Sequence, residues 1–124
     1  MPPPADANSL SFPRARRLTR TAEFSRVKSE GRPQRGALLT LGVLETGTAE
    51  RARVGFVTSR RVGGAVVRNR IRRRLREIFR HHQHAVRPGF WLVVIARPAA
   101  ASASYRALED EWLRLMKRAS ILRP

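Results

Sequence analysis

Arginine side chains, which can bind phosphate groups, are concentrated in one stretch near the middle of the chain. Six of the nine residues from 68 to 76 are arginine. A guanidinium group offers a planar fork of donors for a phosphate and a flat face for a base. At helical spacing Arg68, Arg72 and Arg76 are neighbours four apart, and each such like-charged pair opposes helix formation by about 0.2–0.5 kcal/mol. We therefore expect this stretch to contact nucleic acid; a merely solvated face is the alternative.

The charge of the whole chain also indicates an anionic partner. Its 124 residues include 26 Lys plus Arg against 9 Asp plus Glu, a formal net charge of +17. A compact domain tolerates such self-repulsion best when a polyanion neutralises it, so nucleic acid is the first partner to expect and an anionic membrane the second. The longest apolar run, residues 89–96, is far shorter than the ~20 residues of a membrane span, and the amino end lacks a signal-peptide pattern. We expect a cytoplasmic protein with no membrane partner.

Catalytic and metal-binding patterns are missing from the sequence. The chain has no cysteine, which excludes disulfides, thiolate zinc sites and a cysteine nucleophile. His81, His82 and His84 do not share one helix face and have no carboxylate set to complete a metal site, so a solvated helix end is favoured. Gly63 and Gly64 could admit a phosphate before a helix, but no Walker-type lysine follows, and an ordinary tight turn is at least as well supported. We expect neither a catalytic residue nor a metal site in the polypeptide.

Apolar spacing places the arginines on an amphipathic helix. Over residues 65–82 one stripe of apolar side chains should pack on a sheet, while most of the arginines fill the opposite face. That stripe consists of Val67, Ile71, Leu75, Ile78 and Phe79.

Helix and strand signals fill the rest of the chain after a proline-rich start, residues 1–16, that we expect to be disordered. Residues 90–97 form a continuous apolar run, which is typical of a central strand covered on both faces. Residues 17–122 are therefore predicted to form a single mixed α+β domain. Its other expected elements are helices at 19–30 and 105–120 and strands at 37–44 and 53–59.

Individual polar, acidic and aromatic residues indicate where these helices begin and which side chains enter the core. Thr21 is expected to cap the first helix and Ser104 the last. The acidic residues 109–111 lie early in the last helix, where carboxylates suit the helix dipole. Most aromatic side chains are expected in the core, whereas Phe24 is balanced between core packing and a platform on which a base could stack.

Residues 62–76 (VGGAVVRNRIRRRLR) resemble the signature of the bacterial ribonuclease P protein subunit. That signature has an apolar residue, alanine three positions later, then Arg-Asn-Arg, an apolar residue and further basic residues. Three shorter segments, at 53–55 (RVG), 59–61 (SRR) and 95–97 (IAR), resemble the family in order and spacing. The similarity covers the whole of the expected domain.

The resemblance implies a fold like the second domain of ribosomal protein S5, with a mixed sheet, flanking helices and a left-handed βαβ crossover. It implies that the chain joins a catalytic RNA in a ribonucleoprotein that hydrolyses one phosphodiester bond of precursor tRNA and releases the 5′ leader. Mg²⁺ ions held largely by that RNA would do the chemistry. The chain itself would then need no cofactor, no catalytic residue and no protein partner.

The resemblance also assigns RNA contacts to particular residues. The single-stranded leader would lie in a cleft between the first helix and the sheet. Lys28 stands where many relatives carry a second aromatic residue, and Thr40 stands where many carry tyrosine, so we expect leader contact to depend more on charge than on stacking. The residues implied to bind the catalytic RNA are Arg68, Asn69, Arg70, Arg72, Arg73 and Arg76, and those implied to form the cleft are Phe24, Arg60, Arg61 and Arg97.

Two other functions stay open from the residues alone. A structural ribosomal protein that binds rRNA would carry a similar basic helix, and it would sediment with ribosomal subunits. An autonomous nuclease would cleave RNA with a metal ion and without an RNA partner, which the sparse acidic residues argue against.

Overall fold

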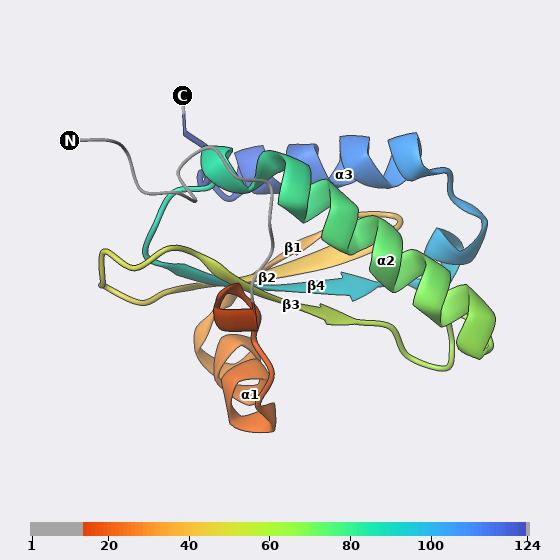
Figure 1. The fold of residues 1–124 in the computed structure, drawn as a ribbon, viewed down its shortest axis with the longest axis horizontal. Helices are drawn as coiled ribbons and strands as arrows, with labels where there is room; N and C mark the ends of the chain where they lie inside the picture. Colours follow the sequence, from red (N-terminus) through yellow and green to blue (C-terminus); the bar gives the residue numbers. More distant parts are fainter. Residues whose placement is uncertain (1–13, 124) are drawn as a thin grey trace.

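A four-stranded sheet with helices on both faces organises the computed structural model, which describes residues 14–123 (Figure 1). Its elements are η1 (Arg14–Arg16), α1 (Thr21–Glu30), β1 (Arg32–Arg35), β2 (Leu39–Glu45), β3 (Arg53–Val57), α2 (Ala65–His82), η2 (Gln83–Ala85), β4 (Phe90–Ala96), η3 (Pro98–Ser102) and α3 (Tyr105–Arg118). Helices α2 and α3 lie on one face of the sheet and α1 lies on the other. This is the single mixed α+β domain that the sequence predicts.

The sheet is mixed because β3 joins it in parallel. The strand order is β1-β2-β4-β3; β1 pairs with β2 and β2 with β4 in antiparallel fashion, whereas β3 runs parallel to β4. Helix α2 connects these two parallel neighbours, so β3–α2–β4 is the expected βαβ unit. The interior position of β4 confirms the central strand predicted from its apolar run. The left-handed sense of the crossover stays a prediction.

Strand β1 is an element that the sequence analysis does not predict. Its four residues, Arg-Pro-Gln-Arg, have no apolar alternation and are mostly exposed. It lies at the edge of the sheet, where a strand tolerates Pro33 because one side of its backbone has no partner to satisfy. The strand therefore exists through its pairing with β2 and not through its own sequence pattern.

Alternate residues of β4 serve two separate hydrophobic cores. Leu92, Val94 and Ala96 belong to the main core shared with α2 and α3. Trp91 and Val93 belong instead to a smaller cluster that includes side chains of α1. Because successive strand residues point to opposite faces, β4 is covered on both sides, as its apolar run predicts.

The apolar stripe of α2 packs as predicted, and the bounds of the helix match the expected ones. Ile71, Leu75, Ile78 and Phe79 are at most 1% exposed, and Val67 is partly buried against the same core. Full burial of one such side chain contributes about 1.5–3 kcal/mol. The stripe therefore fixes the rotation of α2 about its axis and turns its opposite face away from the core.

The helix caps follow the prediction for α3 and depart from it for α1. Ser104 accepts a hydrogen bond from the N–H of Ala107 at 3.1 Å, which confirms it as the cap of α3. Thr21 is already inside α1, and Arg20 takes the cap position. The prediction for Thr21 is wrong because the helix already begins at this residue; the carboxylate of Glu23 folds back over the first turn, and its Oε1 accepts from the backbone N–H of Arg20 at 2.9 Å.

Glu111 has a role that its place in the acidic run does not reveal. Its side chain is 3% exposed, and its two oxygens accept hydrogen bonds at 2.6–3.0 Å from three backbone N–H groups between β1 and β2. A buried carboxylate is stable only when several donors replace water. Glu111 therefore ties α3 to the β1–β2 turn, beyond the dipole role expected for it. The three donors are Ala37, Leu38 and Leu39.

The described chain begins before the domain boundary expected at residue 17. Residues 14–16 form η1, and Arg16 within it is only 7% exposed. Residues 1–13, the rest of the segment expected to be disordered, lie outside the described residues. Within residues 14–123 no helix is both long enough and apolar enough to cross a membrane.

Candidate nucleic-acid interface

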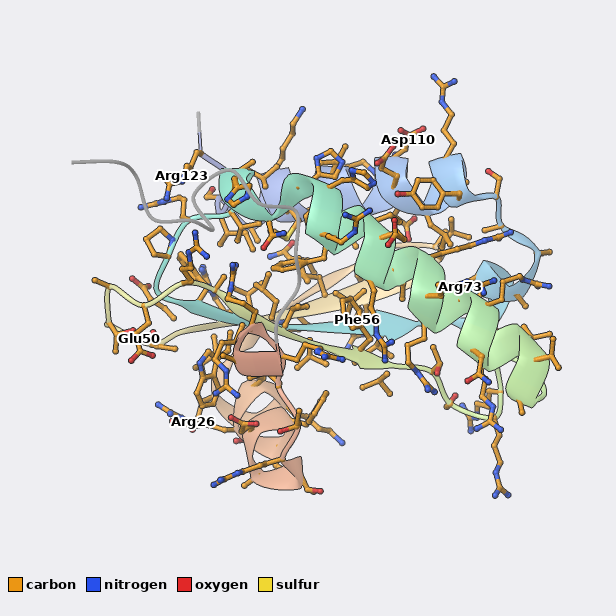
Figure 2. The ribbon with its side chains drawn as sticks, viewed as in Figure 1. Arg26, Glu50, Phe56, Arg73, Asp110 and Arg123 are labelled. Carbon is orange, nitrogen blue, oxygen red and sulfur yellow. The ribbon has the colours of Figure 1, made fainter. Side chains whose placement is uncertain are left out.

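The polar face of α2 presents its cations at different depths. All six residues implied to bind the catalytic RNA lie on this one helix, with Arg73 labelled in Figure 2. Two of the exposed side chains are cationic, and these have the freest access to an RNA backbone. The exposed residues are Asn69, Arg73 and Arg76, and the half-buried ones are Arg68, Arg70 and Arg72.

Arg70 and Arg74 hold α2 against the segment that follows β4. Nη2 of Arg70 donates to the carbonyl oxygen of Ala101 at 3.0 Å, and Nη1 of Arg74 donates to that of Ala103 at 3.0 Å. A carbonyl oxygen accepts a hydrogen bond without neutralising the charge, so both guanidinium groups stay cationic. Arg70 therefore combines a structural contact with the RNA contact that the resemblance implies.

A second group of cations gathers where α2 passes the edge strand β3. Nη2 of Arg72 donates to Oγ1 of Thr58 at 2.8 Å, which ties the helix to the residue after the strand. Although Arg76 is exposed overall, partial desolvation of its guanidinium group, followed by the positive charges of Arg17 and Arg72, lowers its pKa. Arg17 reaches this group because its backbone bridges Val54 at the edge of the sheet. An anion bound here would relieve the repulsion among the three guanidinium groups.

Sequence reasoning missed Arg17 as a member of this group. The residue lies at the start of the expected domain, more than fifty positions from Arg72 and Arg76 in the chain. Only the long-range pairing with β3 brings it close, and no local pattern signals that pairing.

A groove of about 580 Å³, which we call the α1 groove, lies between α1 and the sheet. Phe24 on α1 and Val57, Val93 and Ile95 on the sheet contribute apolar surface to it. Ile95 is 37% exposed, which is high for a large apolar side chain inside a sheet. Cations line the same groove, so it offers both apolar and positively charged surface. These cations are Lys28, Arg32 and Arg35.

Phe24 packs in the smaller core and is also accessible from the groove, while its use as a stacking platform stays a prediction. Its ring packs against the smaller hydrophobic cluster, and a Cβ atom added at Gly55 would lie 2.5 Å from two of its ring carbons. The same ring lines the α1 groove and stays partly exposed. The missing side chain at Gly55 therefore lets the ring pack directly against β3.

The other three residues expected in the cleft are not among those that line the α1 groove. Arg60 and Arg61 are exposed in the connection after β3, and Arg97 is exposed directly after β4. Because β3 and β4 are parallel neighbours, all three follow the same end of the sheet. Nη1 of Arg97 donates to the carbonyl oxygen of Gly36 at 2.7 Å, which joins this end to the β1–β2 turn.

The structure adds cations to the groove that sequence reasoning missed. Lys28 and Thr40, the two departures from the family pattern, both line it, and so do Arg32 and Arg35 of β1. The sequence of β1 has no apolar alternation that marks a strand, so its two arginines cannot be placed in the groove from the sequence. The residues that line the groove thus include three cations and one aromatic ring, that of Phe24.

Ion-pair and ring contacts hold α1 in place beside the groove. Nη1 of Arg53 lies 2.6 Å from Oε2 of Glu23, and the guanidinium groups of Arg26 and Arg53 lie 5.3 and 5.4 Å from the ring centre of Trp91. Burial alone would raise the pKa of Glu23, but backbone N–H donors, that of Arg20 foremost, and the Arg53 guanidinium outweigh it and lower that pKa. The position of α1 on the sheet therefore depends on a polar cluster as well as on apolar packing.

The histidines have carboxylate neighbours that the sequence analysis did not expect. Nε2 of His82 lies 3.0 Å from Oε2 of Glu109, and Nε2 of His81 lies 3.7 Å from Oε2 of Glu77. The first contact forms because α2 packs against α3, and the second forms because Glu77 and His81 lie one helical turn apart on α2. In the part of the chain that the structure describes, no three His, Asp or Glu side chains form a group that could hold a metal ion.

Solved structures share this architecture. The RNase P protein of Thermotoga maritima matches with a TM-score of 0.75 at 28% identity, covering 82% of this chain and 96% of that one. The RNase P protein of Staphylococcus aureus matches in fold with a TM-score of 0.81 at 24% identity, covering 89% of this chain and 100% of that one. The fold that the family resemblance implies, like that of the second domain of ribosomal protein S5, is consistent with these matches.

Sequence relatives agree over nearly the same span. The ribonuclease P protein component of Beutenbergia cavernae is 42% identical over 100 residues, which are 81% of this chain and 84% of the relative. That of Acidothermus cellulolyticus is 43% identical over 109 residues, 86% of this chain and 90% of the relative. The family model described as Ribonuclease P matches residues 12–120, which include both α2 and the α1 groove. The chain therefore belongs to the ribonuclease P protein family.

Proposed function

We propose that this chain, as the protein component of ribonuclease P, binds two RNAs on opposite faces of its sheet. The polar face of α2 contacts the catalytic RNA, and the α1 groove holds the single-stranded 5′ leader of precursor tRNA. Ribonuclease P is an endoribonuclease whose catalytic role lies with its RNA, and this chain is part of that holoenzyme. The observation that carries the proposal is that α2 and α1 lie on opposite sides of one sheet (Figure 1), and the groove lies between α1 and that sheet.

The lining of the α1 groove suits a strand whose sequence varies. A base can stack on the ring of Phe24 and lie against Val93 and Ile95, and such contacts accept any base because every base has a flat face. Lys28 and Arg32 supply positive charge for the phosphates of the same strand. The groove therefore binds backbone and base faces with little reading of base edges, as a leader that differs between precursor tRNAs requires.

The polar face of α2 suits a folded RNA. The deep groove of A-form RNA is closed to side chains, so contact follows backbone shape more than sequence. Arginine is well suited to this because its fork of donors can hold a phosphate through two hydrogen bonds. Cations on both faces of the sheet also reduce the repulsion between the catalytic RNA and the precursor tRNA, which tightens substrate binding.

The chain supplies binding surfaces, and we place the Mg²⁺ requirement in the RNA. Mg²⁺ prefers carboxylate and other oxygen ligands in near-octahedral geometry. The described residues offer no such cluster, and the best-buried carboxylate, Glu111, already accepts three backbone hydrogen bonds. The ribosomal alternative receives no support from the relatives, which are ribonuclease P proteins.

Reconstitution tests this proposal. A candidate catalytic RNA is combined with precursor tRNA at low Mg²⁺, with and without the full chain, and cleavage and substrate affinity are measured. We expect the chain to increase cleavage and to bind a precursor with a leader more tightly than mature tRNA. Cleavage by the polypeptide and metal ion without RNA would favour the autonomous nuclease, and equal affinity for precursor and mature tRNA would contradict leader binding.

A further inference from the structure

Two rows of residues, each crossing all four strands, form the floor of the α1 groove. The rows follow from the pairing of β1 with β2, of β2 with β4 and of β4 with β3. Because neighbouring strands lie about 4.8 Å apart, each row is about 14 Å long. Every residue of the two rows lines the groove except Gly55, against which the Phe24 ring packs. One row consists of Val57, Ile95, Thr40 and Arg35, and the other of Gly55, Val93, Gly42 and Pro33.

Helix α1 crosses the sheet in the same direction as these rows. The ring of Phe24 packs on β3 at Gly55. Val27, about one helical turn later, lies over β2, because its Cγ1 atom would be 3.1 Å from a Cβ atom added at Gly42. The chain then enters β1 directly after the glycine that ends α1. The groove therefore runs across the strands, from Phe24 at its β3 end to β1 at the other end.

The β1 end of the groove is cationic, whereas the β3 end is not. Arg35 belongs to the floor, and Lys28 and Arg32 line the groove beside it. We call these three residues the β1-end cations. They are exposed, and within residues 14–123 none of their side chains has a hydrogen bond, an ion pair or a ring contact. The lining residues contributed by β3 and by the first turn of α1 are uncharged, and no acidic residue lines the groove.

The β3 end of the groove is the end nearer to the cationic helix. On the other face of the sheet α2 packs against β3, whereas α3 covers β1 and β2. Arg118 of α3 donates to the carbonyl oxygen of Arg35 at 3.2 Å, which places α3 behind the β1 edge. Strand β3 is the opposite edge of the sheet, where Arg72 of α2 reaches Thr58. An RNA strand that connects the groove with α2 by the shorter route therefore leaves the groove at its β3 end.

We propose that the 5′ leader crosses the groove from β3 to β1, so that the β1-end cations bind its phosphates farthest from the cleaved bond. This direction rests on the proposed function, in which the catalytic RNA lies on α2. The nucleotides next to the cleaved bond then lie near Phe24. More distant nucleotides reach Lys28, Arg32 and Arg35, whose side chains offer positive charge without a protein partner.

The width of the sheet sets the leader length that these contacts require. A stacked strand advances about 3.4 Å per nucleotide, so roughly four nucleotides cross a floor about 14 Å wide. A shorter leader contacts Phe24 and does not reach Arg32 or Arg35. Because a contact with phosphate carries no base information, affinity depends on the length of the leader more than on its sequence.

A leader-length series on assembled holoenzymes tests the proposal. Precursor tRNAs whose leaders grow by one nucleotide at a time are bound to holoenzymes made with the wild-type chain, with Phe24→Ala or with Arg32→Ala/Arg35→Ala. We expect Phe24→Ala to weaken binding already for the shortest leaders that the wild type distinguishes from mature tRNA. Arg32→Ala/Arg35→Ala should weaken binding at least about 10-fold, and only for leaders roughly four nucleotides longer. For those leaders the salt slope should fall by about 1.4, which is about 0.7 for each of two phosphates.

The direction of the leader and the proposed function fail through different results. If Arg32→Ala/Arg35→Ala binds every leader as the wild type does, or loses affinity at the same leader length as Phe24→Ala, the direction is wrong while leader binding in the groove stands. If neither variant has an effect at any leader length, the groove does not hold the leader, and both proposals are overturned.

Matched variants show whether the effect belongs to these particular cations. Arg106→Ala/Lys117→Ala removes two exposed cations of α3 that do not line the groove, and it should keep the wild-type dependence on leader length. An equal loss in this variant would overturn the proposal, because it would reflect net charge alone. Arg32→Lys/Arg35→Lys keeps both charges and should keep most of the affinity for long leaders.

Uncharged methylphosphonate linkages in the leader test the same contacts without changing the protein, so they decide the question if Arg32→Ala/Arg35→Ala fails to fold. One such linkage is placed at successive positions of a long leader bound to the wild-type holoenzyme. Binding should weaken when the linkage lies roughly four nucleotides beyond the shortest leader that is sensitive to Phe24→Ala. Unchanged binding at every position beyond that length would contradict the proposal.

Discussion

The two faces of the sheet carry the two proposed RNA surfaces, and they are built in different ways. The polar face of α2 belongs to one helix, whose rotation is fixed by a stripe of fully buried side chains. The α1 groove is assembled from α1 and all four strands, over a small cluster formed by Leu18, Val27, Leu44 and Val93. Substitutions of the exposed cations Arg73 and Arg76 of α2 should therefore change mainly RNA affinity, whereas substitutions around the groove should also act through the fold.

The largest effect is expected from removing three cations of α2 together. Arg68→Ala/Arg73→Ala/Arg76→Ala should weaken binding of the catalytic RNA by at least about 100-fold, because hydrogen bonds to charged groups contribute about 1.5–3 kcal/mol each. The salt slope of that affinity should fall by about 2–3. Filter binding over a series of salt concentrations measures both quantities, with Arg106→Ala/Lys117→Ala as the control. An unchanged slope would mean that α2 does not contact RNA phosphates.

Removing the buried carboxylate of α3 should weaken the fold that supports the groove. Glu111→Gln replaces one of the two acceptor oxygens by an NH2 donor, which faces at least one of the three backbone N–H groups, so we expect a loss of about 2–4 kcal/mol in the free energy of unfolding. The exposed neighbour Asp110 provides the control, since Asp110→Asn should change this free energy by less than about 0.5 kcal/mol. Chemical denaturation measures both variants, and equal stabilities would refute the role given to Glu111.

A smaller effect on RNA binding is expected from Phe24. Phe24→Ala removes the aromatic ring that lines it, and base stacking on such a ring contributes about 1–3 kcal/mol. The preference of the holoenzyme for precursor over mature tRNA should fall about 10-fold, while affinity for the catalytic RNA stays within a factor of about two. Phe24→Tyr keeps the ring and should keep the preference. Loss of catalytic RNA affinity in Phe24→Ala would break the separation between the two faces.

The smallest effect concerns pH and the contact between α1 and β3. The pKa of Glu23 is lowered from 4.5 in the folded chain, so the unfolded chain takes up a proton first as the pH falls. Its contribution to stability is therefore complete well above pH 4.5 and is lost as the pH falls through the folded-state pKa. Unfolding measured between pH 7 and pH 3 should show a steeper loss for the wild type than for Glu23→Gln. Parallel curves would show that the contacts of the Glu23 carboxylate with the backbone N–H groups and with Arg53 contribute nothing to stability.

The two faces differ in how well the sequence predicts them, because their contacts span different distances along the chain. The stripe of α2 and its bounds are predictable because residues 65–82 interact mainly with positions three and four away, which a sequence displays directly. The central place of β4 is predictable for a similar reason, since burial on both faces requires a continuous apolar run. The family signature lies in this same predictable region.

The groove is less predictable because its parts meet only in the folded chain. Strand β1 has no apolar pattern, so Arg32 and Arg35 could not be placed in the groove from their sequence. Glu111 resembles any acidic residue in the first half of a helix until its donors at the β1–β2 turn are known. Arg17 reaches α2 only through its bridge to β3. In each case the role of the residue depends on a contact with residues far away in the sequence.

Substrate discrimination measured on assembled holoenzymes tests the separation of the two faces most directly. Holoenzymes made with the wild-type chain, with Phe24→Ala/Lys28→Ala and with the triple α2 variant are compared at protein concentrations that saturate the catalytic RNA, and affinities for precursor and mature tRNA are measured. We expect the groove variant to lose the preference for the leader and the α2 variant to keep it. A groove variant that keeps the preference, or a saturated α2 variant that loses it, would contradict the assignment of one RNA to each face.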